Sequence, residues 1–217
     1  MKKLIEGVAR FQREVYPTHR TLFKDLASSQ NPRWLFITCA DSRIDPSLLT
    51  QTRPGELFIC RNAGNIVPAY GHPGGITATI EYAVMALEVR HIVVCGHSDC
   101  GAMKGILCPD SVKDMPTVAQ WLRFGDSARM MVEENYSHLV GEAQLRALTE
   151  QNVVAQIDNL RTHPAVSSRI RQKRLQIHGW FYDIGDGSMK EYLPQKEAFV
   201  ELTPEKMEEI YSLVNGI

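Results

Sequence analysis

The chain has 217 residues, a length typical of one domain with a substantial hydrophobic core. It carries 24 Lys and Arg residues against 25 Asp and Glu residues, so the formal net charge is −1. This balance lacks the basic surplus of nucleic-acid-binding proteins and the acidic tail of many scaffold proteins. No apolar run approaches the roughly 18 residues that a membrane span requires. We therefore expect no nucleic-acid partner and no membrane association.

The cysteines and the N-terminal residues suggest a cellular location. An odd number of cysteines, five, fits reduced thiols and metal ligands better than a disulfide framework. Charged residues at Glu6, Arg10 and Arg13 appear before any apolar core of signal-peptide length. We expect a soluble, cytoplasmic protein.

The chain begins with a helical arm. Apolar residues recur at helical spacing over 2–15, Pro17 ends or offsets this helix, and Thr18 can cap a second helix to about residue 27. The apolar positions of the first helix are Leu4, Ile5, Val8, Phe11 and Val15. The arm, residues 2–27, either covers its own domain or packs against a partner subunit, and the residues leave both possibilities open.

Short apolar runs then alternate with helical patterns. Strands are predicted at 33–38, 56–60, 91–95 and 175–182, and a hairpin turn at 185–188 leads into an edge strand at 190–193. Helices are predicted at 76–87, 102–108, 116–132, 141–161, 164–173 and 203–215. The alternation predicts an α/β fold, with a mainly parallel sheet of four strands plus an antiparallel edge strand, flanked by helices. We expect one domain over 1–217, with 33–193 as the sheet core and 203–215 as a C-terminal helix.

Two strand ends carry residues that suit a metal ion. Cys39 follows the first predicted strand, and His97 and Cys100 follow the third. The carboxyl ends of parallel strands meet at one edge of a sheet, so these side chains are expected to converge. Two thiolates and an imidazole suit zinc and leave one position of a tetrahedral ion open, which indicates a catalytic rather than a structural site. The alternative is a set of core cysteines without metal.

Asp41 and Arg43 follow the first cysteine closely enough to face the same pocket. Beside an open metal site, Asp41 can either take the fourth metal position or pair with Arg43 and accept a hydrogen bond from water. Arg43 competes with the metal for that carboxylate, which is a hypothesis for a two-state switch. The alternative is a structural ion pair.

Three motifs resemble the β-class carbonic anhydrases. They are Cys-x-Asp-Ser-Arg at 39–43, Arg-Asn-Ala-Gly-Asn at 61–65 and Gly-His-Ser-x-Cys-Gly-Ala at 96–102. The similarity runs from 11–13 to 178–183. It is greatest to bacterial enzymes encoded with cyanate-degrading enzymes and to carboxysomal enzymes. The carboxysomal relatives carry a longer C-terminal extension that this sequence lacks, which argues against carboxysome targeting.

The resemblance implies a role for individual residues. Cys39, His97 and Cys100 would bind Zn²⁺, and Asp41 and Arg43 would form the catalytic pair. Substrate-pocket positions, partly supplied by a neighbouring subunit, would be Gln30, Phe58, Tyr82 and Gly101. Another subgroup forms an inhibitory bicarbonate site with a Trp at the position of Phe36, and the Phe here argues against that site although Arg61 and Tyr182 are present. As alternatives, Phe58 and Tyr82 are core aromatics and Gln30 is a solvated helix end.

The implied activity is zinc-dependent, reversible hydration of carbon dioxide to bicarbonate and a proton by metal-bound hydroxide. Two thiolates cancel the formal charge of the metal, so activity is expected to rise on the alkaline side. The alternatives are a carbonyl sulfide or carbon disulfide hydrolase on the same scaffold, and a non-catalytic zinc-containing adaptor protein of carbon metabolism. The resemblance also implies a homodimer or a dimer of dimers with the arm exchanged between subunits.

Overall fold

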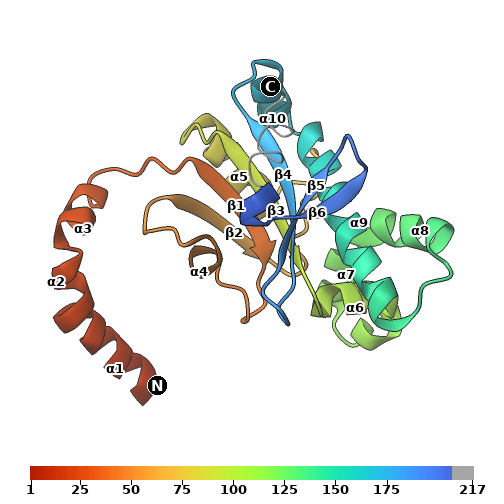
Figure 1. Ribbon diagram of the computed structural model, residues 1–217, viewed down its shortest axis with the longest axis horizontal. Coiled ribbons are helices and arrows are strands. Elements are labelled where there is room, and N and C mark those ends of the chain that lie inside the picture. The colour runs from red at the N-terminus through yellow and green to blue at the C-terminus, as the bar shows by residue number, and fades with distance from the viewer. Residues whose placement is uncertain (207–217) are drawn as a thin grey trace.

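The structure is a computed structural model that describes residues 1–206 (Figure 1). One mixed sheet has the strand order β2-β1-β3-β4-β5-β6. Strands β2, β1, β3 and β4 run parallel to one another, β5 runs antiparallel to β4, and β6 runs antiparallel to β5. The strands are β1 (Trp34–Cys39), β2 (Leu57–Asn62), β3 (His91–His97), β4 (Gln176–Tyr182), β5 (Met189–Leu193) and β6 (Ala198–Glu201). The predicted α/β class and the mainly parallel sheet are confirmed.

Helices cover one face of this sheet and its carboxyl edge. α5 (Gly75–Met85), α9 (Gly141–Thr162) and α10 (Pro164–Arg171) pack on the face that carries Leu35 and Ile37. A second cluster at the carboxyl edge joins the end of β1 to α6 (Gly101–Leu107), α7 (Pro116–Leu122), α8 (Asp126–Asn135) and α9. The other face of the sheet is lined by Phe36, Val93 and Cys95. No helix among the described residues is long and apolar enough to cross a membrane.

Two glycines bring α9 into direct contact with the sheet. A Cβ atom at Gly96 in β3 would lie 2.9 Å from Val153 Cγ2, and one at Gly179 in β4 would lie 2.7 Å from Ile157 Cδ1. Such distances leave no room for a side chain, so glycine at both positions lets the helix approach closely. This packing fixes the end of β3, which carries His97.

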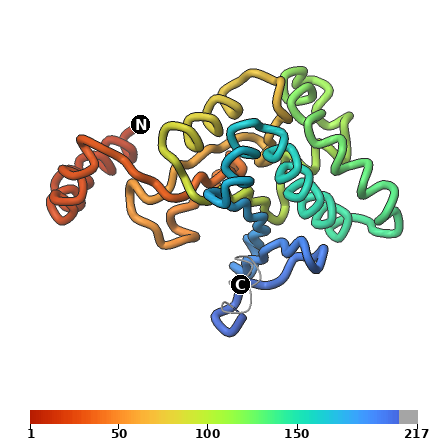
Figure 2. Tube along the Cα trace, turned by 90° about the horizontal axis from the view of Figure 1, so that it is seen from above, coloured from red at the N-terminus to blue at the C-terminus, as the bar shows by residue number. Residues whose placement is uncertain are grey.

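The N-terminal arm projects from one side of the sheet, well away from α6 to α9 (Figures 1 and 2). It consists of α1 (Lys2–Arg10), a π-helical segment (Phe11–Val15), α2 (Tyr16–Thr18) and α3 (Arg20–Leu26). The expected two helices are present, but the junction at Pro17 differs from a simple break. Pro17 has no N–H to donate to the carbonyl oxygen four residues earlier, and its ring would collide with that carbonyl group. The wider π-helical turn before it relieves the collision.

The structure differs from the predicted elements in three further places. The helical region expected at 116–132 is divided by a 3₁₀ turn, Arg123–Gly125. Strand β6 was not predicted, because its four residues are too short for a periodic signal. The helix expected at 203–215 falls mostly outside the described residues, and its beginning, Pro204–Lys206, is a 3₁₀ turn. α4 (Pro46–Thr50) follows the first motif.

Candidate metal centre

Three potential metal ligands converge at the carboxyl edge of the sheet. Cys39 ends β1, His97 ends β3, and Cys100 lies just before α6. Their ligand atoms all lie within 4.8 Å of one another, and all three residues are buried. The convergence that the strand ends predict is thus present.

The hydrogen bonds of His97 leave one ring nitrogen available. Nδ1 lies 2.8 Å from the carbonyl oxygen of Ser98, so this nitrogen carries the proton and donates. Nε2 is buried and has no hydrogen-bond partner among the described residues. An unpaired buried nitrogen is costly unless something else binds its lone pair, and a cation is the usual partner.

The two thiols lie next to each other, and each changes the pKa of the other. Cys39 Sγ and Cys100 Sγ lie 3.9 Å apart, close to the roughly 3.8 Å that a tetrahedral ion with zinc–sulfur bonds of about 2.3 Å requires. The hydrogen bond from Cys100 lowers the pKa of Cys39. The same contact, together with burial, raises the pKa of Cys100. One thiolate thus forms readily, and a cation between the sulfurs would stabilise the second. The donor set fits a soft divalent ion such as zinc.

The remaining described cysteines do not share this environment. Burial raises the pKa of Cys60 to about 11 and that of Cys95 to about 12, and both lie inside strands. Cys108 is exposed. Cys39 and Cys100 are therefore the candidate metal-ligating cysteines.

Asp41 and Arg43 form a two-point ion pair beside these ligands. Arg43 Nε donates to Asp41 Oδ1 at 3.0 Å, and Nη2 donates to Oδ2 at 2.8 Å. These bonds hold the pKa of the Asp41 carboxyl well below its usual range. Asp41 Oδ2 also lies 4.0 Å from His97 Nε2, so the carboxylate borders the position that a metal ion would occupy without reaching the imidazole.

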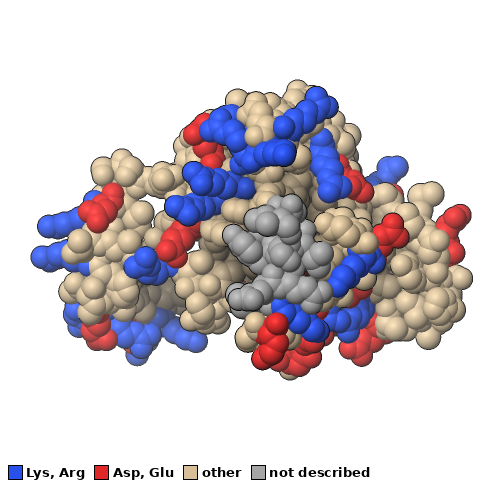
Figure 3. Space-filling model, turned by 45° about the horizontal axis from the view of Figure 1, so that its top comes forward, with Lys and Arg blue, Asp and Glu red and all other residues tan. Residues whose placement is uncertain are grey.

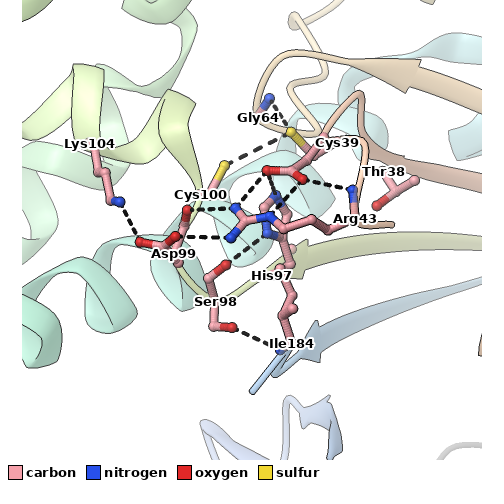
Figure 4. A network of polar contacts seen from close by, with 12 residues as sticks. Thr38, Cys39, Arg43, Gly64, His97, Ser98, Asp99, Cys100, Lys104 and Ile184 are labelled. Atoms are coloured by element: carbon pink, nitrogen blue, oxygen red, sulfur yellow. Dashed lines mark hydrogen bonds and ion pairs between the residues drawn. The ribbon is translucent and has the colours of Figure 1, made fainter. Parts of the chain in front are cut away.

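Several residues that the sequence did not single out support this arrangement. Asp99 and Lys104 continue the ion-pair network from Arg43 (Figure 4). The backbone N–H of Gly64 donates to Cys39 Sγ at 3.4 Å. Arg61 binds the carbonyl oxygens of Cys39 and Asp41, at 3.1 and 2.7 Å, and so holds the turn after β1. The sequence offered one signal for Asp99. Arg43 has five N–H donors, which is more than the Asp41 carboxylate alone accepts, so a second acceptor was to be expected.

The expected pocket residues lie elsewhere in the same chain. Phe58 and Tyr82 contact each other, with ring centroids 6.0 Å apart, but Phe58 pairs with Leu35, four residues before Cys39. At about 3.3 Å per residue, that is roughly 13 Å along the strand. Gln30 precedes β1 altogether. The structure therefore does not bring these three residues to the metal ligands of their own chain. Gly101 does lie beside Cys100, and a Cβ there would meet no atom within 4 Å.

Comparisons with known proteins agree with this geometry. The family model described as carbonic anhydrase matches residues 34–189. A carbonic anhydrase from Pseudomonas aeruginosa is 51% identical over 203 residues, which cover 93% of this chain and 92% of that protein. The solved structure of the β-carbonic anhydrase CcaA superposes with a TM-score of 0.91 at 45% identity, covering 94% of this chain and 92% of the other. This chain belongs to the β-class carbonic anhydrases.

Further relatives extend the comparison. A carbonic anhydrase from Synechococcus elongatus is 50% identical over 191 residues, which cover 87% of this chain and 70% of that protein. A structure from a study of two tetrameric β-carbonic anhydrases of Sordaria macrospora has a TM-score of 0.80 at 32% identity, covering 88% of this chain and 95% of that one. β-Carbonic anhydrases are zinc enzymes, and Cys39, His97 and Cys100 form a group that can hold such an ion. The resemblance inferred from the three motifs is confirmed, and the family and fold indicate hydration of carbon dioxide.

Proposed function

We propose that this carbonic anhydrase interconverts carbon dioxide and bicarbonate with one zinc ion held by Cys39, His97 and Cys100. The observation that carries the proposal is the unpaired Nε2 of His97 in a buried site with two thiols, all within 4.8 Å. When bound, zinc supplies the Lewis acidity that turns water into a nucleophile near neutral pH. Two thiolate ligands offset more of the metal charge than imidazoles do, so we expect the rate to rise toward alkaline pH.

In this proposal Asp41 orients the attacking water and Arg43 controls Asp41. Both carboxylate oxygens of Asp41 already accept hydrogen bonds from Arg43, which keeps the carboxylate ionised and directed. Oδ2 is the oxygen nearer the metal position, at 4.0 Å from His97 Nε2, and it can accept a hydrogen bond from water there. The alternative position of Asp41, as a fourth ligand, requires breaking its bonds to Arg43.

The carbon dioxide pocket is proposed to form between two copies of the chain. Phe58 lies four strand residues from the level of its own Cys39, and Gln30 precedes β1. Tyr82 on α5 contacts Phe58 and is half exposed. A second copy can place these side chains over the metal centre, where aromatic rings and one amide suit a small apolar substrate. We propose a homodimer or a dimer of dimers, with each copy a single domain in which residues 2–27 form the arm. The sheet core expected at 33–193 extends further, because β6 continues the sheet to Glu201.

Metal removal tests this function. The purified protein is dialysed against a chelator, and hydration of carbon dioxide is followed by stopped flow before and after addition of Zn²⁺ or Mg²⁺. We expect activity to disappear with the zinc and to return with Zn²⁺ but not with Mg²⁺, because the donor set is two sulfurs and one nitrogen. Full activity in metal-free protein would contradict the proposal.

A further inference from the structure

Asp99, in the turn between the proposed ligands His97 and Cys100, binds Arg43 (Figure 4). This contact is on the edge of the guanidinium away from Asp41. Arg43 Nη1 donates to Asp99 Oδ2 at 3.0 Å, and Nη2 donates to the Asp99 carbonyl oxygen at 3.2 Å. The other carboxylate oxygen of Asp99 pairs with Lys104 on α6. The contacts therefore run from Lys104 through Asp99 and Arg43 to Asp41.

The guanidinium of Arg43 is consequently held at both edges. One edge faces Asp41 through Nε and Nη2, and the other faces Asp99 through Nη1 and Nη2. A planar guanidinium bound by a single carboxylate can turn together with that partner, whereas two partners on different turns fix its plane. Arg43 is 43% exposed and lines a groove of about 1200 Å³ together with Asp99 and Lys104, so space for such a movement exists.

Stability alone gives little reason for this arrangement. The side chains of Asp99 and Lys104 are 55% and 54% exposed, and exposed ion pairs typically contribute little to stability. Asp99 also has a φ of +56°, a left-handed conformation that most side chains disfavour. The more substantial effect of the contacts is geometric, since they determine where Arg43 holds Asp41.

We propose that Asp99, braced by Lys104, is a positioning residue that fixes Arg43 so that Asp41 stays beside the metal position without entering it. This inference rests on the proposed function of the site. Without the Asp99 carboxylate, Arg43 and Asp41 move as a pair, and Asp41 Oδ2 starts only 4.0 Å from His97 Nε2. Misplacement of a catalytic group by about 1 Å can cost on the order of 100-fold in rate.

Two substitutions at Asp99 distinguish the loss of its contact with Arg43 from backbone strain at its positive φ. Asp99→Gly removes the side chain and tolerates the positive φ, while Asp99→Asn keeps a neutral acceptor of the same shape. The matched control is Asp158→Ala, which removes another exposed carboxylate paired with an arginine, Arg161, at 2.7 Å on α9. Zinc content, urea unfolding, kcat and KM are measured for each protein, and visible spectra are recorded after replacement of zinc by Co²⁺.

We expect Asp99→Gly to retain its zinc and its unfolding midpoint, to lose at least tenfold in kcat with KM within about twofold, and to show an altered Co²⁺ spectrum at neutral pH. The kcat of Asp99→Asn should lie between that of Asp99→Gly and that of the wild type. The kcat and Co²⁺ spectrum of Asp158→Ala should match those of the wild type. Lys104→Met should shift kcat in the same direction by less, and adding it to Asp99→Gly should change little more.

An unchanged kcat and Co²⁺ spectrum in Asp99→Gly would overturn the positioning role, and so would loss of zinc or of stability, which would mark a structural role. Failure of the proposed function would look different. The wild-type protein itself would then show no zinc-dependent hydration, whereas the Co²⁺ spectra of wild type and Asp99→Gly would still report whether Asp99 governs the ligand environment.

Discussion

Removal of the Asp41 side chain should separate binding of the metal from catalysis. Asp41 accepts two hydrogen bonds from the Arg43 side chain and lies beside the metal position, but it is not one of the three ligands that converge there. We expect Asp41→Ala to retain zinc and to lose at least 100-fold in kcat, because the attacking water loses its acceptor. Stopped-flow hydration and metal analysis on one preparation measure both quantities. An Asp41→Ala protein with wild-type turnover would show that the carboxylate is dispensable.

At the scale of single residues, the ligands could be predicted and their supporting contacts could not. Cys39 and His97 end neighbouring parallel strands, so the topology alone brings them together. Asp99 lies in the turn after β3 with a positive φ, and its carboxylate reaches Arg43 in the turn after β1. Neither that conformation nor the contact from Gly64 to Cys39 has a distinctive sequence pattern.

At the scale of elements, the arm is the segment whose apolar face the single chain leaves open. Leu4 and Val8 in α1 are 69% and 56% exposed, and no residue of α1 is buried. Aromatic contacts among Phe11, Tyr16 and Phe23 hold the arm together without joining it to the sheet. These features support the proposal that the arm packs on a second copy of the chain.

Substitutions on that face test the proposed exchange of the arm. The double change Leu4→Ser and Val8→Ser should weaken the dimer at least tenfold, since burying one Leu contributes about 1.5–3 kcal/mol. Activity should fall at low protein concentration, because the proposed pocket takes Phe58 and Tyr82 from the partner. Lys2→Ser, on a residue with 91% of its side chain exposed, is the control. Sedimentation velocity measures the dissociation constant of the dimer. An unchanged dissociation constant would argue that the arm has another role.

The long, periodic elements were predictable and the short ones were not. The four parallel strands and helix α9 have clear apolar patterns, and the structure contains them within a few residues of the expected bounds. β6 has four residues and the 3₁₀ turn at Arg123–Gly125 has three, so each depends on tertiary contacts more than on its own sequence.

At the scale of the whole molecule, a second polar network lies at the amino ends of the strands, opposite the metal centre. Glu191 accepts from His178 Nδ1 at 2.9 Å, and His178 Nε2 accepts from His91 Nδ1 at 3.1 Å. The ring of His91 stacks on Trp34. Burial and the positive charge of its neighbours lower the pKa of His91 to about 4.

This shift predicts how stability depends on pH. The unfolded chain protonates His91 near pH 6.5, whereas the folded protein keeps it neutral down to about pH 4, so unfolding takes up a proton between these values. The free energy of unfolding should therefore fall as the pH is lowered from 7.5 to 5, and less so in His91→Gln. Urea unfolding of both proteins at the two pH values measures the difference. Parallel pH profiles would show that His91 does not contribute.

The oligomeric state is the feature that is hardest to predict from the sequence of one chain. Of the residues expected to line the pocket, Phe58 lies beside Leu35, four strand residues before Cys39 of the same chain. This distance supports the proposal that a second copy completes the site. The order of the motifs along the sequence does not contain that information.

The coordination shell of the metal tests the central claim most directly. Zinc X-ray absorption on the purified protein should show two sulfur neighbours at about 2.3 Å and one imidazole nitrogen at about 2.0–2.1 Å, with one further light ligand. This is the shell that Cys39, Cys100 and His97 Nε2 can provide. A shell of nitrogen and oxygen atoms without sulfur, or fully active protein without zinc, would contradict the account.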